Sequence, residues 1–196
     1  MSLIPKRLSV KFFTKDGATV ELEPLIGVFQ SWIQQQAVEG LLIDVADYSH
    51  VFEGPGVLLI GDEGDYSLDV SGGRAGVQYT RKRQQGNSLD ALITTCLWLA
   101  RQAGAKLEED LPLAFDYSTV QITFFDRLNT PNTPKVVEQL HKALTSFFAE
   151  QLGINDVQIE NATGDSRYAP TFLVKLPQTL AITDLQNTGT EAIQQA

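Results

Sequence analysis

The chain lacks positive charge over a long stretch, because residues 16–73 contain neither lysine nor arginine. We call this stretch the acidic window. Its 58 residues include 11 carboxylates, and the rest of the chain is slightly basic, so the formal net charge of −9 arises within the window. The pI of about 4.6 argues against nucleic acid as a partner, because binding to phosphates requires clustered positive charge. The carboxylates of the window are Asp16, Glu21, Glu23, Glu39, Asp44, Asp47, Glu53, Asp62, Glu63, Asp65 and Asp69.

Cysteine and long apolar segments are also scarce. Cys96 is the only cysteine, which excludes an internal disulfide. No apolar run approaches the ~20 residues that cross a bilayer, and the N-terminal sequence lacks the apolar region and cleavage site of a secretory signal. Apolar residues make up 43% of the chain, as is ordinary for a folded domain. We therefore expect a soluble, cytoplasmic protein that does not bind membranes.

Three segments have the apolar spacing of helices that pack one face on a core. Asn87 or Ser88 is expected to cap the first turn of one of them, and Thr133 is expected to cap the first turn of another. Gly104 and Gly153 are expected to end the same two helices, because glycine tolerates the left-handed conformation found at helix ends. The three segments are residues 88–103, 135–152 and about 24–38.

Between the helices the apolar period changes to two, which is typical of strands. Asp16 and Gly17 predict a tight turn into a strand at 19–22. The continuous apolar run at 41–45 predicts a buried strand. Hairpins would join most of the strands, so we expect an α+β fold with largely antiparallel, mixed sheet or sheets and three main helices. The other expected strands are residues 8–13, 57–60, 66–70, 76–81, 119–125, 157–160 and 171–176.

The two halves of the chain, about residues 6–85 and 113–176, contain similar elements in the same order. In each half a predicted strand is followed by a proline, a predicted helix, a glycine and a second predicted strand. This pattern fits a divergent internal duplication, and it also fits a coincidence of common signals. We expect residues 1–176 to form a single domain. Residues 177–196 have little apolar character and are expected to form a loosely ordered tail.

Residues 40–69 read GLLIDVADYSHVFEGPGVLLIGDEGDYSLD. This segment resembles part of an uncharacterised bacterial protein family of unknown function. The resemblance covers about 30 residues and contains no catalytic signature. It implies a compact domain in a bacterial cytosol, and it assigns no active-site role to any residue.

Four side chains of this segment form a candidate site for a divalent metal, namely Asp44, Asp47, His50 and Glu53. They follow or end a predicted strand, and one imidazole with several carboxylates suits a divalent cation. The alternative is turn chemistry, because aspartate and serine side chains commonly accept hydrogen bonds from nearby backbone N–H groups. Both interpretations remain open.

The sequence identifies no catalytic residues and no cofactor-binding residues. Ser49 and His50 are neighbours without a nucleophile elbow, and the glycine-rich residues 71–76 match neither the Rossmann fingerprint nor the P-loop. Cys96 lies on the apolar stripe of its helix, as a buried structural thiol would. We therefore favour a non-enzymatic binding domain with an acidic face. This domain would bind a protein partner or form a homo-oligomer. The alternative is a metal-assisted enzyme or small-ligand-binding domain with its site at residues 44–53.

The sign of the charge reverses directly after the acidic window. Residues 81–83 are all basic, and pairing of consecutive strands could place them opposite the carboxylates of the turn at 62–65. Part of the acidic charge would then be neutralised within the molecule. Eleven carboxylates cannot all be balanced locally, so we expect a surplus that attracts divalent cations or a basic partner.

Overall fold

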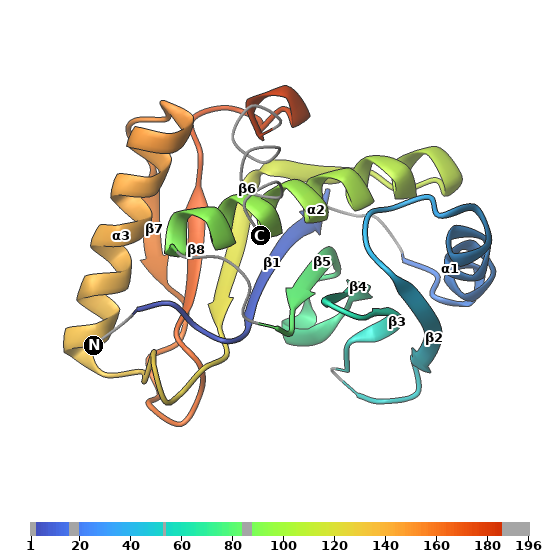
Figure 1. Ribbon diagram of the computed structural model, residues 1–196, viewed down its shortest axis with the longest axis horizontal. Coiled ribbons are helices and arrows are strands. Elements are labelled where there is room, and N and C mark those ends of the chain that lie inside the picture. The colour runs from blue at the N-terminus through green and yellow to red at the C-terminus, as the bar shows by residue number, and fades with distance from the viewer. Residues whose placement is uncertain (1–2, 16–19, 53, 84–87, 186–196) are drawn as a thin grey trace.

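The computed structural model describes residues 3–15, 20–52, 54–83 and 88–185 (Figure 1). The helices are α1 (Glu23–Gln35), α2 (Leu89–Asp110) and α3 (Pro134–Leu152), and a short 3₁₀ turn covers Ser71–Gly73. The strands are β1 (Leu8–Thr14), β2 (Leu42–Tyr48), β3 (Gly56–Gly61), β4 (Gly64–Asp69), β5 (Gly76–Arg81), β6 (Phe115–Phe124), β7 (Gln158–Asn161) and β8 (Thr171–Lys175). Among these described elements, no helix combines the length and the apolar character needed to cross a membrane.

All eight strands lie in one sheet, in the order β2-β3-β4-β5-β1-β6-β8-β7, and every neighbouring pair is antiparallel. Figure 1 shows α2 and α3 on the same side of this sheet, with α1 beside the β2 end. The helices and the facing side chains of the sheet form one continuous core, in which Leu8, Val10 and Phe12 of the central strand β1 are fully buried. The predicted α+β class, the antiparallel sheet and the three main helices are thereby confirmed.

The predicted helix caps are present where they were expected. The Ser88 hydroxyl accepts a hydrogen bond from the Ala91 N–H at 3.1 Å, and the Thr133 hydroxyl accepts one from the Val136 N–H at 3.5 Å. Gly153 has a φ of 64°, the left-handed conformation that ends α3. These caps satisfy backbone groups that a helix end leaves without partners inside the helix.

Gly104 does not end α2, so that prediction is wrong. The helix continues through this residue to Asp110. A Cβ atom at Gly104 would lie 2.6 Å from the Tyr117 hydroxyl oxygen and 3.1 Å from its ring. The glycine therefore allows α2 to approach β6 closely, which is a requirement of tertiary packing that the local sequence does not show.

The expected burial of the strand at 41–45 is also wrong. β2 is an edge strand that pairs only with β3 among the described strands. Leu41 and Ile43 are 70% and 55% exposed. The predicted hairpin turn at Asp16 and Gly17 lies outside the described residues, and residues 20–22 are not in a strand. β1 instead pairs with β5 and β6, which are distant in the sequence.

The internal duplication is not confirmed. In the first half, β1 and β2 are separated in the sheet by β3, β4 and β5. In the second half, the corresponding strands β6 and β7 are separated by β8 alone. The two strand–helix–strand units therefore enter the sheet with different topologies.

Residues 177–185 pack on the domain, whereas the sequence predicted a loose segment. Leu180 and Leu185 are fully buried. The Leu180 N–H donates to the Tyr117 carbonyl at 3.0 Å, and the Arg101 Nε donates to the Leu180 carbonyl at 3.1 Å. The remainder of the predicted tail, residues 186–196, lies outside the described residues.

The close approach of α2 to β6 gives a prediction with a matched control. Gly104→Ala should lower the free energy of unfolding by about 1–3 kcal/mol, because the new methyl group overlaps Tyr117. Gly27 of α1 has no atom within 4 Å of the position its Cβ would take, so Gly27→Ala should raise stability by about 0.5–1 kcal/mol. Urea unfolding of both variants measures the difference. Stabilisation by both substitutions would contradict the packing described here.

The packing of residues 177–185 gives a second prediction. Leu180→Ala should destabilise the protein by about 2–5 kcal/mol, because it leaves a cavity beside β6 and α2. Thr183 is exposed in the same segment, and Thr183→Ala should change stability by less than about 0.5 kcal/mol. Equal effects in chemical denaturation would show that this segment does not belong to the core.

Candidate functional site

The structure separates the carboxylates of the predicted metal site. Asp44 and Asp47 are three residues apart in β2, and successive side chains of a strand point to opposite faces. Asp44 accordingly pairs in register with Ile60, and Asp47 pairs with Val57. Their oxygens accept local hydrogen bonds, Asp44 from the Val45 N–H and Asp47 from the Ser49 N–H, both at 2.8 Å.

His50 follows β2 and is exposed, and Glu53 lies outside the described residues. The Ser49 hydroxyl and N–H hold the pKa of Asp47 below its usual range, and the nearby His50 imidazole adds to this effect. No group of three or more histidine, cysteine, aspartate or glutamate side chains in the described part of the chain is arranged to hold a metal ion. The four-residue set with Glu53 stays a prediction.

The basic residues 81–83 lie opposite the turn at 62–65, as the sequence predicted. The register of β4 and β5 pairs Gly64 with Arg81 and so brings the two segments together. Three of the carboxylates in the acidic window are thereby neutralised within the molecule. The ion pairs are Arg81–Glu63 at 3.2 Å, Lys82–Asp65 at 2.8 Å and Arg83–Asp62 at 2.8 Å.

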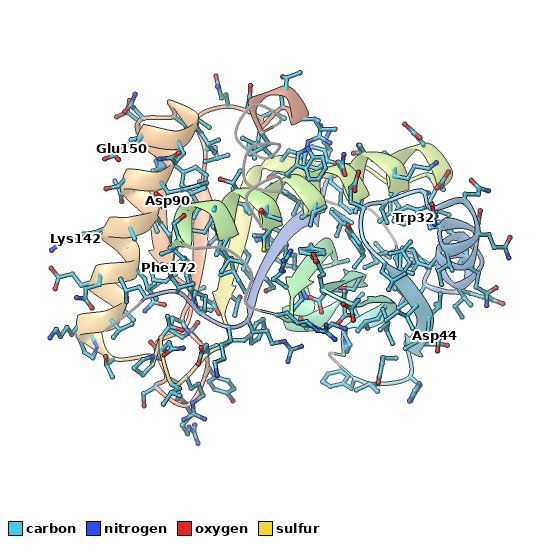
Figure 2. All side chains as sticks on the ribbon, viewed as in Figure 1. Trp32, Asp44, Asp90, Lys142, Glu150 and Phe172 are labelled. Atoms are coloured by element: carbon cyan, nitrogen blue, oxygen red, sulfur yellow. The ribbon has the colours of Figure 1, made fainter. Side chains whose placement is uncertain are left out.

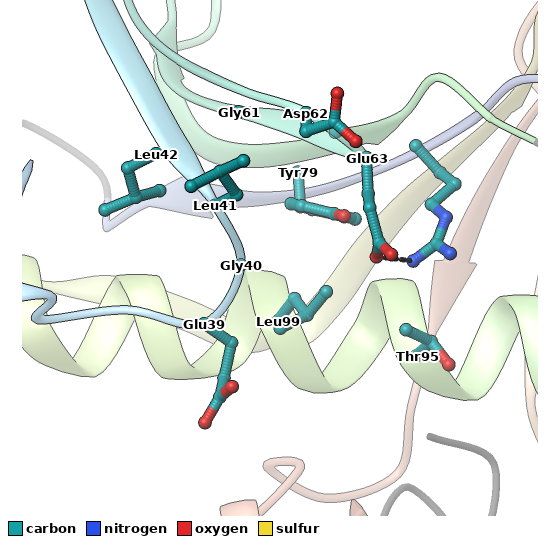
Figure 3. A pocket seen from close by; sticks show the side chains of 12 residues that line it. Glu39, Gly40, Leu41, Leu42, Gly61, Asp62, Glu63, Tyr79, Thr95 and Leu99 are labelled. Atoms are coloured by element: carbon teal, nitrogen blue, oxygen red, sulfur yellow. Dashed lines mark ion pairs between the residues drawn. The ribbon is translucent and has the colours of Figure 1, made fainter. Parts of the chain in front are cut away.

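A pocket of about 230 Å³ lies beside these ion pairs, between α2, the β3–β4 turn and the segment that leads into β2 (Figure 3). We call it the end pocket. Leu41, Leu42, Leu99 and the ring of Tyr79 provide its apolar surface. Carboxylates contribute the other part of its lining, namely Glu39, Asp62 and Glu63.

Buried polar side chains fix the walls of the end pocket. Arg81 is 5% exposed, and its guanidinium group contacts Glu63, as the dashed line in Figure 3 shows, while its Nε donates to the Arg83 carbonyl at 3.2 Å. The Tyr66 hydroxyl donates to the Glu39 carbonyl at 2.8 Å. This hydrogen bond holds the segment that leads into β2 against the sheet. Burial raises the pKa of Tyr79, so this phenol stays neutral at physiological pH.

Sequence reasoning missed this pocket because its lining comes from distant segments. Tyr79 belongs to β5, Leu99 to α2, and residues 39–42 to the connection between α1 and β2 and to the first residue of β2. No local pattern joins them. The exposed fractions of Leu41 and Ile43 depend on β2 being an edge strand, and the sequence predicted the opposite.

Cys96 lies on α2 between two residues that line the end pocket, Thr95 and Leu99, but its own side chain is fully buried. Burial raises the pKa of the Cys96 thiol to about 12, and the positive charge of Arg81 only partly opposes this. The thiolate is the reactive form of cysteine. Cys96 is therefore a structural residue and not a nucleophile of the site.

Comparison with known proteins adds no assignment. No model of a known protein family matches the chain, and no curated protein matches it. The function is therefore inferred from the geometry of the domain.

The buried state of Cys96 gives a prediction about its reactivity. At about pH 9 an ordinary thiol is mostly deprotonated and alkylates rapidly, whereas Cys96 should remain protonated and shielded. Iodoacetamide should not label the native protein within minutes, and it should label the protein completely in about 6 M guanidinium chloride. Mass spectrometry measures both outcomes. Rapid labelling of the native protein would contradict the burial of Cys96.

Proposed function

We propose that the protein is a non-enzymatic binding domain that takes up a basic, extended segment of a protein partner at the β2 end of its sheet. The observation that carries the proposal is the end pocket, where an apolar surface adjoins Glu39, a carboxylate that forms no ion pair with a described residue. A lysine or arginine side chain matches this arrangement, because it has an aliphatic stem and a cationic end. A cytoplasmic location belongs to the same proposal and is supported by the lone, unpaired Cys96.

Unbalanced negative charge supports a basic partner. The structure pairs four carboxylates of the acidic window, three with residues 81–83 and Asp69 with Lys11. Five others are exposed and form no ion pair with a described residue. They belong to α1, its flanking residues and β2, at the same end of the domain as the end pocket, and are Glu21, Glu23, Glu39, Asp44 and Asp47. Such a surface accelerates the association of an oppositely charged partner.

Exposed apolar side chains next to these carboxylates support contact with a protein and not with a free ion. Leu41, Ile43 and Tyr48 are 70%, 55% and 43% exposed on or next to β2, and Phe52 beyond it is 92% exposed. Single exposed apolar residues are ordinary, but several along one edge strand favour an interaction surface, because the strand also has unpaired backbone groups. An extended segment that runs along β2 would cover these side chains and reach the end pocket.

The experiment uses a synthetic peptide of alternating lysine and threonine as the probe. We expect calorimetry to detect binding at about 50 mM salt and an affinity that falls at least about tenfold at about 500 mM salt, because exposed charges are screened. A peptide with glutamate in place of lysine should not bind. Leu41→Ser should weaken binding without unfolding the protein, since this side chain is mostly exposed.

Two double variants separate this surface from general charge effects. Glu39→Gln/Asp44→Asn should reduce the affinity at least about tenfold. The matched control is Glu150→Gln/Glu160→Gln, which removes the same charge from α3 and β7; Figure 2 shows Glu150 and Asp44 at opposite ends of the molecule. Equal losses in both double variants, or no peptide binding at low salt, would refute the proposal. A salt-sensitive dimer that only Glu39→Gln/Asp44→Asn dissociates would assign the surface to a second copy of the chain instead.

A further inference from the structure

The face of the sheet opposite the helices has an unusual property. In an antiparallel sheet the face away from the core normally exposes its polar side chains to solvent. Here no described helix covers that face, yet its polar residues in the central strands are almost fully buried. Ser9, Lys11, Ser67, Asp69, Thr80 and Thr123 are between 1% and 7% exposed. The strands and their flanking segments therefore form a hollow that surrounds polar groups.

Strand register explains which side chains share this hollow. Ser67 pairs with Gln78, Gln78 with Lys11, and Lys11 with Gln121, so the four side chains form one row across β4, β5, β1 and β6. Residues directly opposite one another in antiparallel strands lie on the same face. A second row, two residues further along the strands, consists of Asp65, Thr80, Ser9 and Thr123.

A cavity of about 320 Å³ lies on these rows, and we call it the face cavity. Its polar lining consists of the carboxylates Asp65 and Asp69 and of the uncharged side chains Ser67, Ser71, Gln78, Thr80, Gln121 and Thr123. Pro55 and Leu58 close one end, and Arg7 and Phe125 close the other. The volume lies within the range of sites for small molecules.

Several polar groups of the lining have unused hydrogen-bonding capacity. Ser67 is 3% exposed, and its hydroxyl makes no hydrogen bond to another described residue. The Gln121 side-chain amide likewise has no partner in the described ranges. The Gln78 amide nitrogen donates to the Thr80 hydroxyl at 3.3 Å, which leaves its oxygen free to accept. Because these groups line the cavity, they are available to a ligand with matching donors and acceptors.

The charges around the face cavity leave one cation in excess. Asp69 pairs with Lys11 at 2.5 Å, and Asp65 pairs with Lys82 at 2.8 Å. Arg7 forms no ion pair with a described residue, and its guanidinium carbon lies 5.7 Å from the ring centroid of Phe125. The stacked arginine can bind an anionic oxygen at the mouth of the cavity while the uncharged side chains of the lining contact uncharged polar groups.

We propose that the face cavity binds a small polyhydroxylated anion, a molecule of about the size of one sugar ring with a single phosphate or carboxylate group. The ligand's hydroxyl groups hydrogen-bond to Ser67, Gln78 and Gln121, and its anionic group contacts Arg7. This site lies on a different face from the end pocket and does not depend on the partner proposed for that pocket.

The test compares four probes by calorimetry and by ligand-observed NMR: glucose 6-phosphate, glucuronate, glucose and inorganic phosphate. We expect one of the two charged sugars to bind at least about tenfold more tightly than both glucose and inorganic phosphate, because the site requires hydroxyl groups and charge together. The charged sugar that binds more tightly shows whether the site prefers a phosphate or a carboxylate group. Inorganic phosphate that binds as tightly as the sugars would indicate an adventitious ion only, and would overturn the proposal.

Single variants assign the binding to the face cavity. Arg7→Gln and Gln121→Ala should each weaken the preferred sugar at least about tenfold, the first through the anionic group and the second through a hydroxyl contact. Arg127→Gln is the matched control, because Arg127 is an exposed arginine that does not line the cavity. Thermal unfolding of each variant verifies that it is folded. Unchanged affinity in both cavity variants, or no binding of either charged sugar at about 10 mM, would overturn the proposal.

Discussion

The ion pair between Lys11 and Asp69 holds together the part of the sheet on which the rest of the structure depends. The Lys11 Nζ lies 2.5 Å from Asp69 Oδ2 and 3.3 Å from the Ser71 carbonyl oxygen, and the Ser71 hydroxyl donates to the same carboxylate at 2.6 Å. Lys11 belongs to β1 and Asp69 to β4, so the side chain crosses the intervening strand β5 at Gly76. A Cβ atom at Gly76 would lie 2.4 Å from the Phe12 carbonyl oxygen and 2.9 Å from the Lys11 Cε, so the backbone of β1 and the Lys11 side chain both require glycine here. Burial lowers the pKa of Lys11, and the charge and hydrogen bond of Asp69 oppose this shift. Removal of one partner from a buried pair typically costs about 3–5 kcal/mol.

This pair also sets the chemistry of the uncovered face. β1 lies between the meander β2–β5 and the strands β6, β8 and β7, and the ion pair adds a side-chain contact from β1 to β4 to the backbone pairing of β1 with β5. Because Lys11 pairs with Asp69 and Lys82 pairs with Asp65, both carboxylates that line the face cavity are neutralised. Arg7 at the mouth then decides the sign of the charge that the cavity favours.

Strand register, together with sequence position, determines which charged side chains lie next to one another. The pairing of β4 with β5 brings residues 81–83 against the turn at 62–65, and three ion pairs absorb part of the acidic window. The carboxylates of the acidic window that form no ion pair with a described residue lie at the end of the sheet that carries exposed apolar side chains. The end pocket and the face cavity have no lining residue in common and lie on opposite faces of the sheet, so the domain has one surface suited to a basic protein segment and another suited to a small anion.

The sequence by itself determined the α+β class, the three main helices with their caps and most of the strands, because these depend on interactions within a few residues. The Ser88 and Thr133 caps are of this kind, and so are the apolar stripes of α2 and α3, on which Leu97 and Leu140 respectively are fully buried. The tertiary structure alone decided that Gly104 lies inside a helix, that β2 is an edge strand and that Leu180 and Leu185 are buried. Only the tertiary structure shows that Lys11 forms a buried ion pair with Asp69, which is 58 positions away. In the sequence, Lys11 has the pattern of an ordinary polar residue in an alternating strand. These features depend on which strands become neighbours, and that choice is made by long-range packing of the whole sheet against its helices.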